Sequence, residues 1–300
     1  MEQPVSVYNG IVIDYSRDKL LPEKGLAMLT AKGFYKKDNE DSPQQSFARA
    51  ATCYCFGDYE LAQRIYDAAS KHWFTFASPV LSNAVDVEWP TFTEDEWLDA
   101  ASWLQRNVEP DGMPISCFLV KIPDNKRGIV EARTETAWLS MMGGGVGVYA
   151  ANRSPDEKST GVMSHLRGYD ADTLSYRQTA SRRGSIAAYA DITHPEIQSF
   201  IQMRNPVGGD ANKKCFNLNN AVNLPDSFME AVINEQDYEL VDPKHGPTGR
   251  KLNAAKVFEE VLEMRFETGE PYLHFVDTSN RCKPKQITNP LYKVEQSNLC

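Results

Sequence analysis

Long apolar runs and an excess of basic charge are both missing from this chain of 300 residues. No apolar stretch approaches the roughly 18 residues that a membrane-spanning helix needs, and residues 1–10 lack the charged and then apolar pattern of a signal peptide. The net charge of −9 argues against a basic face that would hold a nucleic-acid backbone. We therefore expect a cytoplasmic protein that binds neither membranes nor nucleic acids, although a local arginine cluster can still bind single nucleotides.

Patterns of metal ligands are missing too. The six cysteines form no CxxC pair, and in a chain of this length they do not suggest a disulfide framework. The five histidines are scattered without the spacing of metal ligands. We expect no metal site, and in a reducing cytosol a special cysteine would be catalytic or redox-active.

Two regions with different patterns make up the chain. Residues 1–107 carry apolar residues mostly at helical spacing, which predicts a mainly helical N-terminal domain. From residue 108 to residue 300, strand-like runs alternate with helical stretches, and this alternation predicts parallel β/α units. The five strand-like runs cover 116–122, 145–151, 184–192, 219–225 and 272–278.

Local signals place several helix ends. Asp58 follows a break between two helical patterns and is suited to cap the second helix. Two capping-box patterns, Thr93 with Glu96 and Thr193 with Glu196, predict further helix starts. A hairpin is expected around Gly246-Pro247, and the final residues "LYKVEQSNLC" look like the close of a strand.

The predicted strand set is incomplete as a fold. A barrel needs closure and an open sheet needs covered edges. Five parallel strands followed by "SNLC" satisfy neither condition. On this argument alone, the chain looks like part of a larger structure.

The glycine run in "SMMGGGVGVYAANR" invites comparison with a phosphate-binding loop. A dinucleotide fingerprint runs from strand through glycines to helix, whereas these glycines follow a helix and precede a strand. We therefore expect a helix C-cap followed by a close approach of another group to the backbone. That group can be a ligand, because glycine lets a ligand lie against the main chain.

Three further positions are ambiguous when each is taken alone. Arg182, with its arginine neighbour in "ASRRGSIAAY", precedes a strand and suits either a solvated surface or an anion site. Cys117 lies among apolar neighbours, where a cysteine usually acts as a small hydrophobe. Ser78 precedes a proline in "FASPVLSNA", which is typical of a turn.

Taken together, these segments resemble the large catalytic subunit of class I ribonucleotide reductase. The resemblance spans roughly residues 75–300 and rests on seven segments in order: "ASPVLSNA", "PISCFLV", "GGGVGVYAANR", "RRGSIAAYADITHPEI", "NNAVNLPDSFM", "PYLHFVDTSNR" and "QSNLC". It implies a ten-stranded α/β barrel made of two antiparallel halves of five parallel strands each. The chain would then be a helical N-terminal region followed by the first five-stranded half of that barrel.

The resemblance also implies a chemistry. Cys300 would become a transient thiyl radical, generated by a partner subunit, that takes hydrogen from the ribose of a ribonucleoside diphosphate. Asn298 would hydrogen-bond the ribose hydroxyls, and Cys117 would be one of two cysteines that deliver reducing equivalents and finish as a disulfide. Further contacts to the substrate would come from Ser78, Ser116 and Gly145.

Regulation and partners follow from the same resemblance. ATP or a deoxynucleoside triphosphate would bind as allosteric effector at Asp124, Asn125 and Arg153, with Arg182 linking the effector to the substrate base. No cofactor is expected in this chain itself. The implied partners are the C-terminal half of the large subunit, a diiron-tyrosyl or dimanganese small subunit, a second large subunit in a dimer, and thioredoxin or glutaredoxin as reductant.

Several residues and segments that the family resemblance implies are not in this sequence. The glutamate two residues beyond Cys300, the second redox cysteine, the radical-relaying tyrosines and the N-terminal ATP cone are not found. We expect the first half of a split or truncated subunit that is inactive without its other half. The alternatives are a non-catalytic nucleotide-binding regulatory half, a cobalamin-dependent or anaerobic reductase, and an unrelated α/β enzyme.

Overall fold

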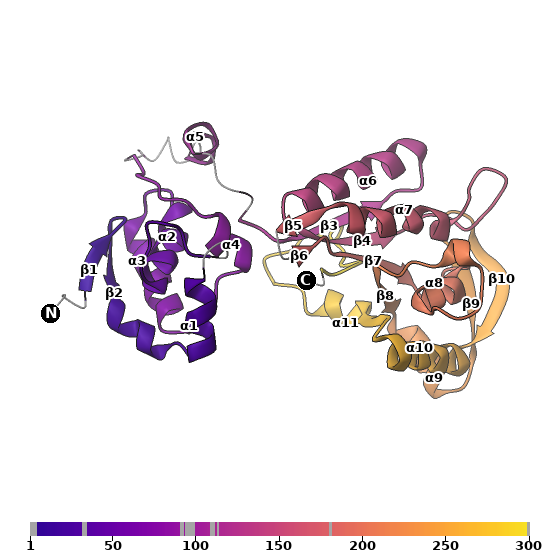
Figure 1. Cartoon of the computed structure of the whole chain (residues 1–300). Coiled ribbons are helices and arrows are strands. Elements are labelled where there is room, and N and C mark those ends of the chain that lie inside the picture. The colour runs from indigo at the N-terminus through magenta and orange to yellow at the C-terminus, as the bar shows by residue number, and fades with distance from the viewer. Residues whose placement is uncertain are drawn as a thin grey trace. The chain divides into compact units, whose positions relative to one another are not determined.

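The computed structural model describes residues 5–31, 35–90, 93, 100–108, 112, 114–179 and 182–298 (Figure 1). The chain forms two compact units, Met1–Ser116 and Cys117–Cys300. We describe each unit by itself. The division predicted after residue 107 remains a prediction.

The first unit combines a small strand pair with helices packed around a buried helix. β1 (Val5–Tyr8) and β2 (Ile11–Asp14) pair antiparallel. Within α2, Arg49 is 1% exposed and pairs with Glu40 at 2.6 Å, so this charge is buried together with its partner. The helices are a 3-10 turn (Tyr15–Leu20), α1 (Glu23–Thr30), α2 (Pro43–Cys53), α3 (Tyr59–Ser70), α4 (Ser78–Asn83) and α5 (Ala100–Asn107).

The predicted pair of helices with a break before Asp58 is confirmed. The side chain of Asp58 accepts a hydrogen bond from the N–H of Leu61 and so caps α3. At the start of α2, Ser42 and Gln45 form a capping box that was not predicted. The predicted box at Thr93 cannot be placed, because its glutamate lies outside the described residues.

The second unit is built on one five-stranded sheet in the order β11-β8-β7-β4-β3. Every neighbouring pair is parallel, as the sequence predicted, and the sheet forms half of an α/β barrel. The strands are β3 (Cys117–Ile122), β4 (Gly145–Ala150), β7 (Ile186–Asp191), β8 (Asn219–Leu224) and β11 (Tyr272–Phe275).

Helices cover one face of this sheet. Side chains such as Val148, Ile186 and Val222 point into an apolar core shared with these helices. Among the described helices, none is long and apolar enough to cross a bilayer. The helices are α6 (Lys126–Met141), α7 (Val162–Ser175), α8 (Ile197–Ile201), α9 (Asp226–Ile233), α10 (Ala254–Thr268) and α11 (Val276–Arg281), with 3-10 turns at Gln202–Arg204 and Ala211–Lys213.

Two small antiparallel pairs lie outside the five-stranded sheet. β5 (Arg177–Thr179) pairs with β6 (Arg182–Arg183), and β9 (Asp237–Asp242) pairs with β10 (Gly246–Asn253). The second pair is the predicted hairpin, and its turn directly precedes Gly246.

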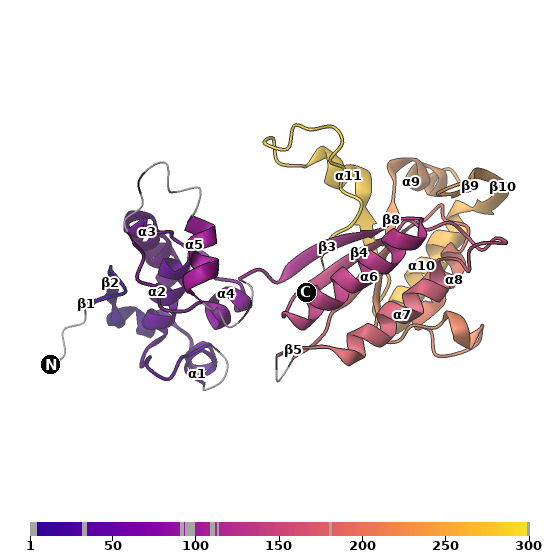
Figure 2. The same ribbon diagram turned by 90° about the horizontal axis from the view of Figure 1, so that it is seen from above.

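The opposite face of the sheet carries the end of the chain. Figure 2 shows α6 and α7 on one side of the sheet, and α11 with the trace that follows it on the other. Residues 293–298 have no helix or strand, so the expected terminal strand is wrong for the described part of that segment. Side-chain amides, rather than ladder hydrogen bonds, hold this segment to the sheet.

The predicted capping box at Thr193 is also wrong. Glu196 is the N-cap residue of α8, and no side chain caps that helix. The carboxylate of Glu196 instead accepts a hydrogen bond from the N–H of Val162, 2.6 Å away, because the start of α7 packs against it. His194 has a structural role, since its Nδ1 accepts from the N–H of Glu196 and its Nε2 donates to the carbonyl of Asn152.

Candidate functional site

The candidate site is the face of the sheet that the helices leave open. Alternate residues of a strand point to opposite faces, and Val120, Ile122, Val146 and Val148 point toward the helices. Their neighbours therefore point to the open face. On the five strands this face carries Cys117, Leu119, Lys121, Gly145, Gly147, Tyr149, Ala187, Tyr189, Asp191, Asn219, Ala221, Asn223, Tyr272 and His274.

Residues 294–298 lie across this open face and are held by their own side-chain amides. The Nδ2 of Asn298 donates to the carbonyl of Gly145 at 2.5 Å and to that of Phe118 at 3.2 Å. The Nε2 of Gln296 donates to the carbonyl of Val120 at 3.0 Å. These hydrogen bonds fix the distance between the segment and the open face of β3 and β4.

The glycine run continues into β4 at Gly147, where the space beside the backbone is already occupied. A Cβ at this position would lie 2.2 Å from the carbonyl oxygen of Ser297, which no real side chain tolerates. The close backbone approach predicted from the glycines is therefore present, and the group that approaches is the chain's own terminal segment. Gly143, with φ of +91°, ends α6 in a conformation that favours glycine.

Three of the predicted site residues lie together at one end of the face. Cys117 begins β3 and is paired in register with Gly145, the first residue of β4. Asn298 donates to the carbonyl of this same glycine. Ser116 directly precedes Cys117 in the chain, and the side chain of Cys117 is exposed.

Three other predicted site residues either fall partly or wholly outside the described residues or lie in the first unit. Cys300 lies outside the described residues, and so does the side chain of Arg182, whose backbone belongs to β6. Ser78 begins α4 in the first unit, and its Oγ accepts a hydrogen bond from the hydroxyl of Tyr35 at 3.1 Å.

A polar network occupies the other end of the open face. The hydroxyl of Tyr149 donates to Asp191 at 2.6 Å, and the amide of Asn223 donates to the same carboxylate at 2.9 Å. His274 Nδ1 lies 2.7 Å from Asn223 Oδ1, and its Nε2 lies 3.0 Å from the hydroxyl of Ser279. The network thus joins β4, β7, β8 and β11 through their side chains.

Burial and charge set the protonation of this network. Burial raises the pKa of Tyr149 well above its usual value, and the charge of Asp191 adds to the effect. Burial lowers the pKa of His274, although Asp191 opposes that shift. At neutral pH the side chains of Tyr149 and His274, which surround the carboxylate of Asp191, are therefore both uncharged.

The three described residues of the predicted effector site also lie together. Asp124 and Asn125 follow β3, and Arg153 follows β4, so they meet at the carboxyl edge of neighbouring strands. Arg153 lies 3.4 Å from Asp124 and 3.3 Å from Asp156, which places its guanidinium between two carboxylates. The side chain of Asn125 caps α6 by accepting from the N–H of Gly128.

The polar network was not predicted from the sequence. Its signal was present as polar residues at alternate positions of otherwise apolar strands, as in "AAYAD", "NNAVN" and "YLHF". Parallel strands covered on both faces usually read as continuous apolar runs, so these interruptions were informative. The contacts to residues 294–298 had no such signal, because a segment without regular structure makes them.

Comparison with protein families agrees with this architecture. The family model described as the barrel domain of ribonucleotide reductase matches residues 115–300. The model described as its all-alpha domain matches residues 22–87.

Curated relatives support the same assignment. The ribonucleoside-diphosphate reductase large subunit of Invertebrate iridescent virus 3 is 37% identical over 97% of this chain and 50% of its own length. The corresponding subunit of Invertebrate iridescent virus 6 is 39% identical over 97% of this chain and 28% of its own length. A putative large subunit of Frog virus 3 is 40% identical over 85% of this chain and 41% of its own length. The chain thus spans half or less of the length of these relatives, and it belongs to the family of ribonucleotide reductase large subunits.

Proposed function

We propose that this chain is the N-terminal part of a catalytic subunit that reduces ribonucleoside diphosphates to deoxyribonucleoside diphosphates for DNA synthesis. Membership of the family supports the reaction class. The observation that carries the proposal is that Asn298, two residues before Cys300, donates to Gly145 at the point where Cys117 pairs with that glycine. A reducing thiol, a polar amide and a side-chain-free stretch of backbone therefore meet on one face.

In the proposed reaction Cys300 is the radical residue. A radical from the partner subunit removes its thiol hydrogen, and the resulting thiyl takes a hydrogen atom from a ribose carbon. The S–H bond is weak enough for this exchange to be reversible. Two thiols, one of them Cys117, then supply two electrons and two protons, so that the 2′-hydroxyl leaves as water and the thiols end as a disulfide. The sugar radical finally takes the hydrogen back from the Cys300 thiol, which becomes a thiyl again, and the radical then returns to the partner subunit.

Further residues are assigned to contact the substrate. Asn298 is assigned to hydrogen-bond the ribose hydroxyls, and Gly145 is assigned to let the substrate approach the main chain. Ser116 and Ser78 are assigned to the substrate as hydroxyl donors. A closed, water-poor site formed with the remainder of the barrel would protect the radical.

The effector site is assigned to Asp124, Asn125 and Arg153, with Arg182 as the link to the substrate. Binding of a deoxynucleoside triphosphate or ATP there has to overcome the present ion pairs of Arg153, because a phosphate would compete with two carboxylates for one guanidinium. The effector is therefore expected to rearrange the loop that carries Asp156.

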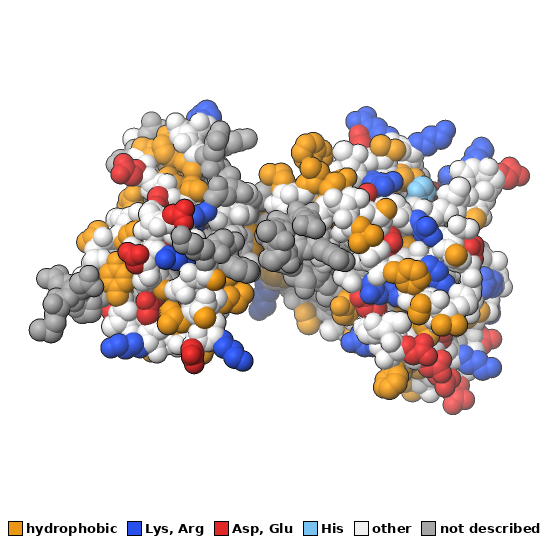
Figure 3. All heavy atoms as spheres, in the orientation of Figure 1, with side chains coloured by type: hydrophobic (Ala, Val, Ile, Leu, Met, Phe, Trp, Pro, Cys, Tyr) orange, Lys and Arg blue, Asp and Glu red, His pale blue; other side chains and the backbone are white. Residues whose placement is uncertain are grey.

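Partners complete this function. The rest of the barrel, a diiron-tyrosyl or dimanganese small subunit, and thioredoxin or glutaredoxin would supply closure, radical and electrons in the cytoplasm. A dimer contact through α6 is supported by exposed apolar side chains along that helix, visible in Figure 3, which include Val130, Trp138 and Met141. Val130, Trp138 and Met141 are 65%, 61% and 50% exposed, and apolar side chains gathered along one helix are typical of an interface.

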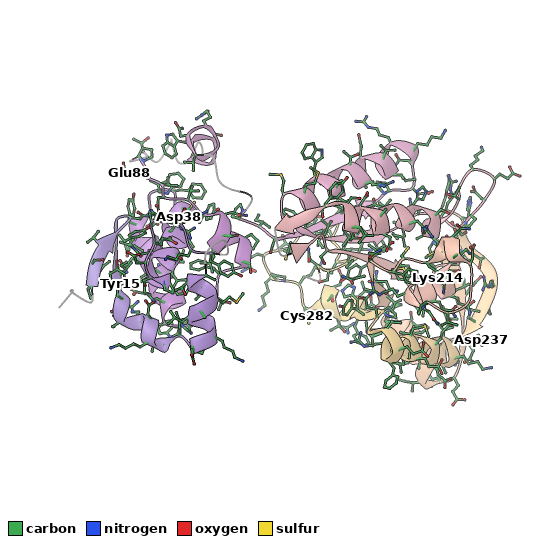
Figure 4. The ribbon with its side chains drawn as sticks, in the orientation of Figure 1. Tyr15, Asp38, Glu88, Lys214, Asp237 and Cys282 are labelled. Carbon is green, nitrogen blue, oxygen red and sulfur yellow. The ribbon has the colours of Figure 1, made fainter. Side chains whose placement is uncertain are left out.

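Reconstitution tests the proposal. The complete large subunit that contains this chain is combined with its radical-generating subunit and assayed for conversion of ribonucleoside to deoxyribonucleoside diphosphate. Cys300→Ser is expected to abolish turnover and to leave effector binding intact, because the hydroxyl O–H bond is too strong for the exchange. The matched control is Cys282→Ser, since Cys282 is the C-cap residue of α11 and is exposed (Figure 4). Turnover by Cys300→Ser would contradict the proposal, and activity with cobalamin but without the small subunit would reject the class I assignment.

A further inference from the structure

We propose that Asn223, oriented by His274 and Asp191, is a positioning residue that sets where residues 294–298 lie over the sheet. Its Nδ2 donates to the main-chain carbonyl of Glu295 at 2.8 Å. The inference rests on the proposed function, because the segment so positioned carries Asn298 and leads to Cys300.

The orientation of the Asn223 amide follows from its neighbours. Its nitrogen faces the carboxylate of Asp191 and the carbonyl of Glu295, and both of these groups can only accept. The amide oxygen must therefore face His274, so that His274 donates from Nδ1–H. The Nε2 of the neutral ring then accepts from the hydroxyl of Ser279. Every polar atom of the asparagine side chain is thus committed, and the amide has one orientation.

The segment is also fixed on either side of this contact. Asn280 of α11 forms two hydrogen bonds with Val294, the residue before Glu295. Its Nδ2 donates to the carbonyl of Val294, and its Oδ1 accepts from the N–H of Val294. Lys121 of β3 binds the carboxylate of Glu295 at 2.7 Å. The side chain of Glu295 therefore points to β3 while its carbonyl points to β8.

The contacts that hold the segment differ in burial, and this difference decides how much each one contributes to the position of the segment. Asn223 is 1% exposed, whereas the side chains of Lys121 and Glu295 are 51% and 35% exposed. An exposed ion pair contributes little and weakens with salt, whereas a buried acceptor that loses its donor is strongly penalised. The hydrogen bond from Asn223 therefore contributes more to the register of the segment than the ion pair of Lys121 does, and it acts together with the amides of Gln296 and Asn298.

This arrangement predicts an effect on turnover rather than on substrate affinity. The network lies at the carboxyl end of the strands, at Asp191 and Asn223, while Cys117 and Gly145 are the first residues of their strands. Asn223 therefore acts on the proposed chemistry through the segment. Small displacements of reacting groups cost large factors in rate.

The test is Asn223→Ala in the complete large subunit reconstituted with its radical-generating subunit. We expect hydrogen–deuterium exchange in the peptide that covers residues 294–298 to be at least about tenfold faster. We also expect kcat to fall by about 10- to 100-fold with KM changed by less than about twofold. His274→Ala removes the donor that orients the amide and is expected to shift both quantities in the same direction by a smaller factor.

Asn220→Ala is the matched control. Asn220 lies on the same strand, is 0% exposed, and also donates from Nδ2 to a main-chain carbonyl, that of Phe200, on the helix-covered face. We expect this variant to lose thermal stability and to keep wild-type exchange in residues 294–298 and wild-type kcat per folded molecule. Equal changes in exchange for both asparagine variants, or no change for either, would overturn the proposal. A wild-type protein that reduces no substrate would instead refute the proposed function, and the exchange result would still decide the positioning role.

Discussion

At the scale of single residues, one missing side chain shapes the site. Gly147 lies on the open face, between Leu119 of β3 and the backbone of Ser297. A methyl group added at this position would occupy the space that the Ser297 carbonyl now fills. The glycine run predicts a close approach to the backbone, but the approaching group could not be identified from the sequence, because residue 297 is far from residue 147 in the chain and carries no matching pattern.

Gly147→Ala is therefore expected to displace the terminal segment. The new methyl group would lie 2.2 Å from a main-chain oxygen, which cannot rotate away as a side chain can. We expect kcat to fall by about tenfold or more, measured in the reconstituted enzyme, with faster hydrogen exchange in residues 294–298. The control is Gly249→Ala, where φ is +74° and nothing lies within 4 Å, so that only backbone strain is added. Equal activity of the two variants would contradict the account.

At the scale of secondary-structure elements, the five strands and most helices of the second unit were predictable. Apolar runs bounded by turn signals locate strands well, and Asp58 located a helix start through its side-chain chemistry. The start of α8 was not predictable, because Glu196 makes a contact to Val162 that only the folded chain brings near. Tertiary contacts of this kind override a local capping pattern.

The β9–β10 hairpin shows how such a contact is made. Asp242 ends β9 and accepts hydrogen bonds from the N–H and hydroxyl of Ser154, in the loop after β4. It also accepts from the N–H groups of Lys244 and His245 in the hairpin turn. Burial alone would raise the pKa of this carboxyl, but the hydrogen bonds outweigh it and lower the pKa to about 2.

Asp242→Asn is expected to destabilise the protein at neutral pH. Because the folded pKa lies below the ordinary value of 3.8, the ionised carboxylate stabilises the fold above about pH 4 and loses this contribution as the pH falls toward 2. Chemical denaturation at pH 7 should show a loss on the order of 2 kcal/mol, and the difference from wild type should shrink between pH 4 and pH 2. The exposed Asp237, at the other end of the same strand (Figure 4), is the control and should change stability by less than about 0.5 kcal/mol. A pH-independent difference for Asp242→Asn would exclude the charge as its cause.

At the scale of the whole molecule, the sheet of the second unit has one face covered by helices and one crossed by a single segment. A strand edge and a face left in this condition require a further structure to cover them. The sequence predicted this need from the strand count alone. The contacts that form the site could not be predicted in the same way, because Asn298 reaches Gly145 across 153 positions of the chain.

The central claim is that the terminal segment brings Asn298 to the end of the sheet where Cys117 lies. The most direct measurement is disulfide trapping in the complete subunit, with Asn298→Cys introduced in a background where Cys282, Cys300 and the second redox cysteine that would otherwise pair with Cys117 are replaced by serine. The amide of Asn298 donates to the carbonyls of Gly145 and Phe118, which are the register partner and the chain neighbour of Cys117, and a disulfide spans Cα atoms up to about 6.8 Å apart. We therefore predict that mild oxidation links residue 298 to Cys117, detected by peptide mass spectrometry. Glu295→Cys in the same background, about 13 Å further along β3, should not form this link, and a link at 295 without one at 298 would contradict the account.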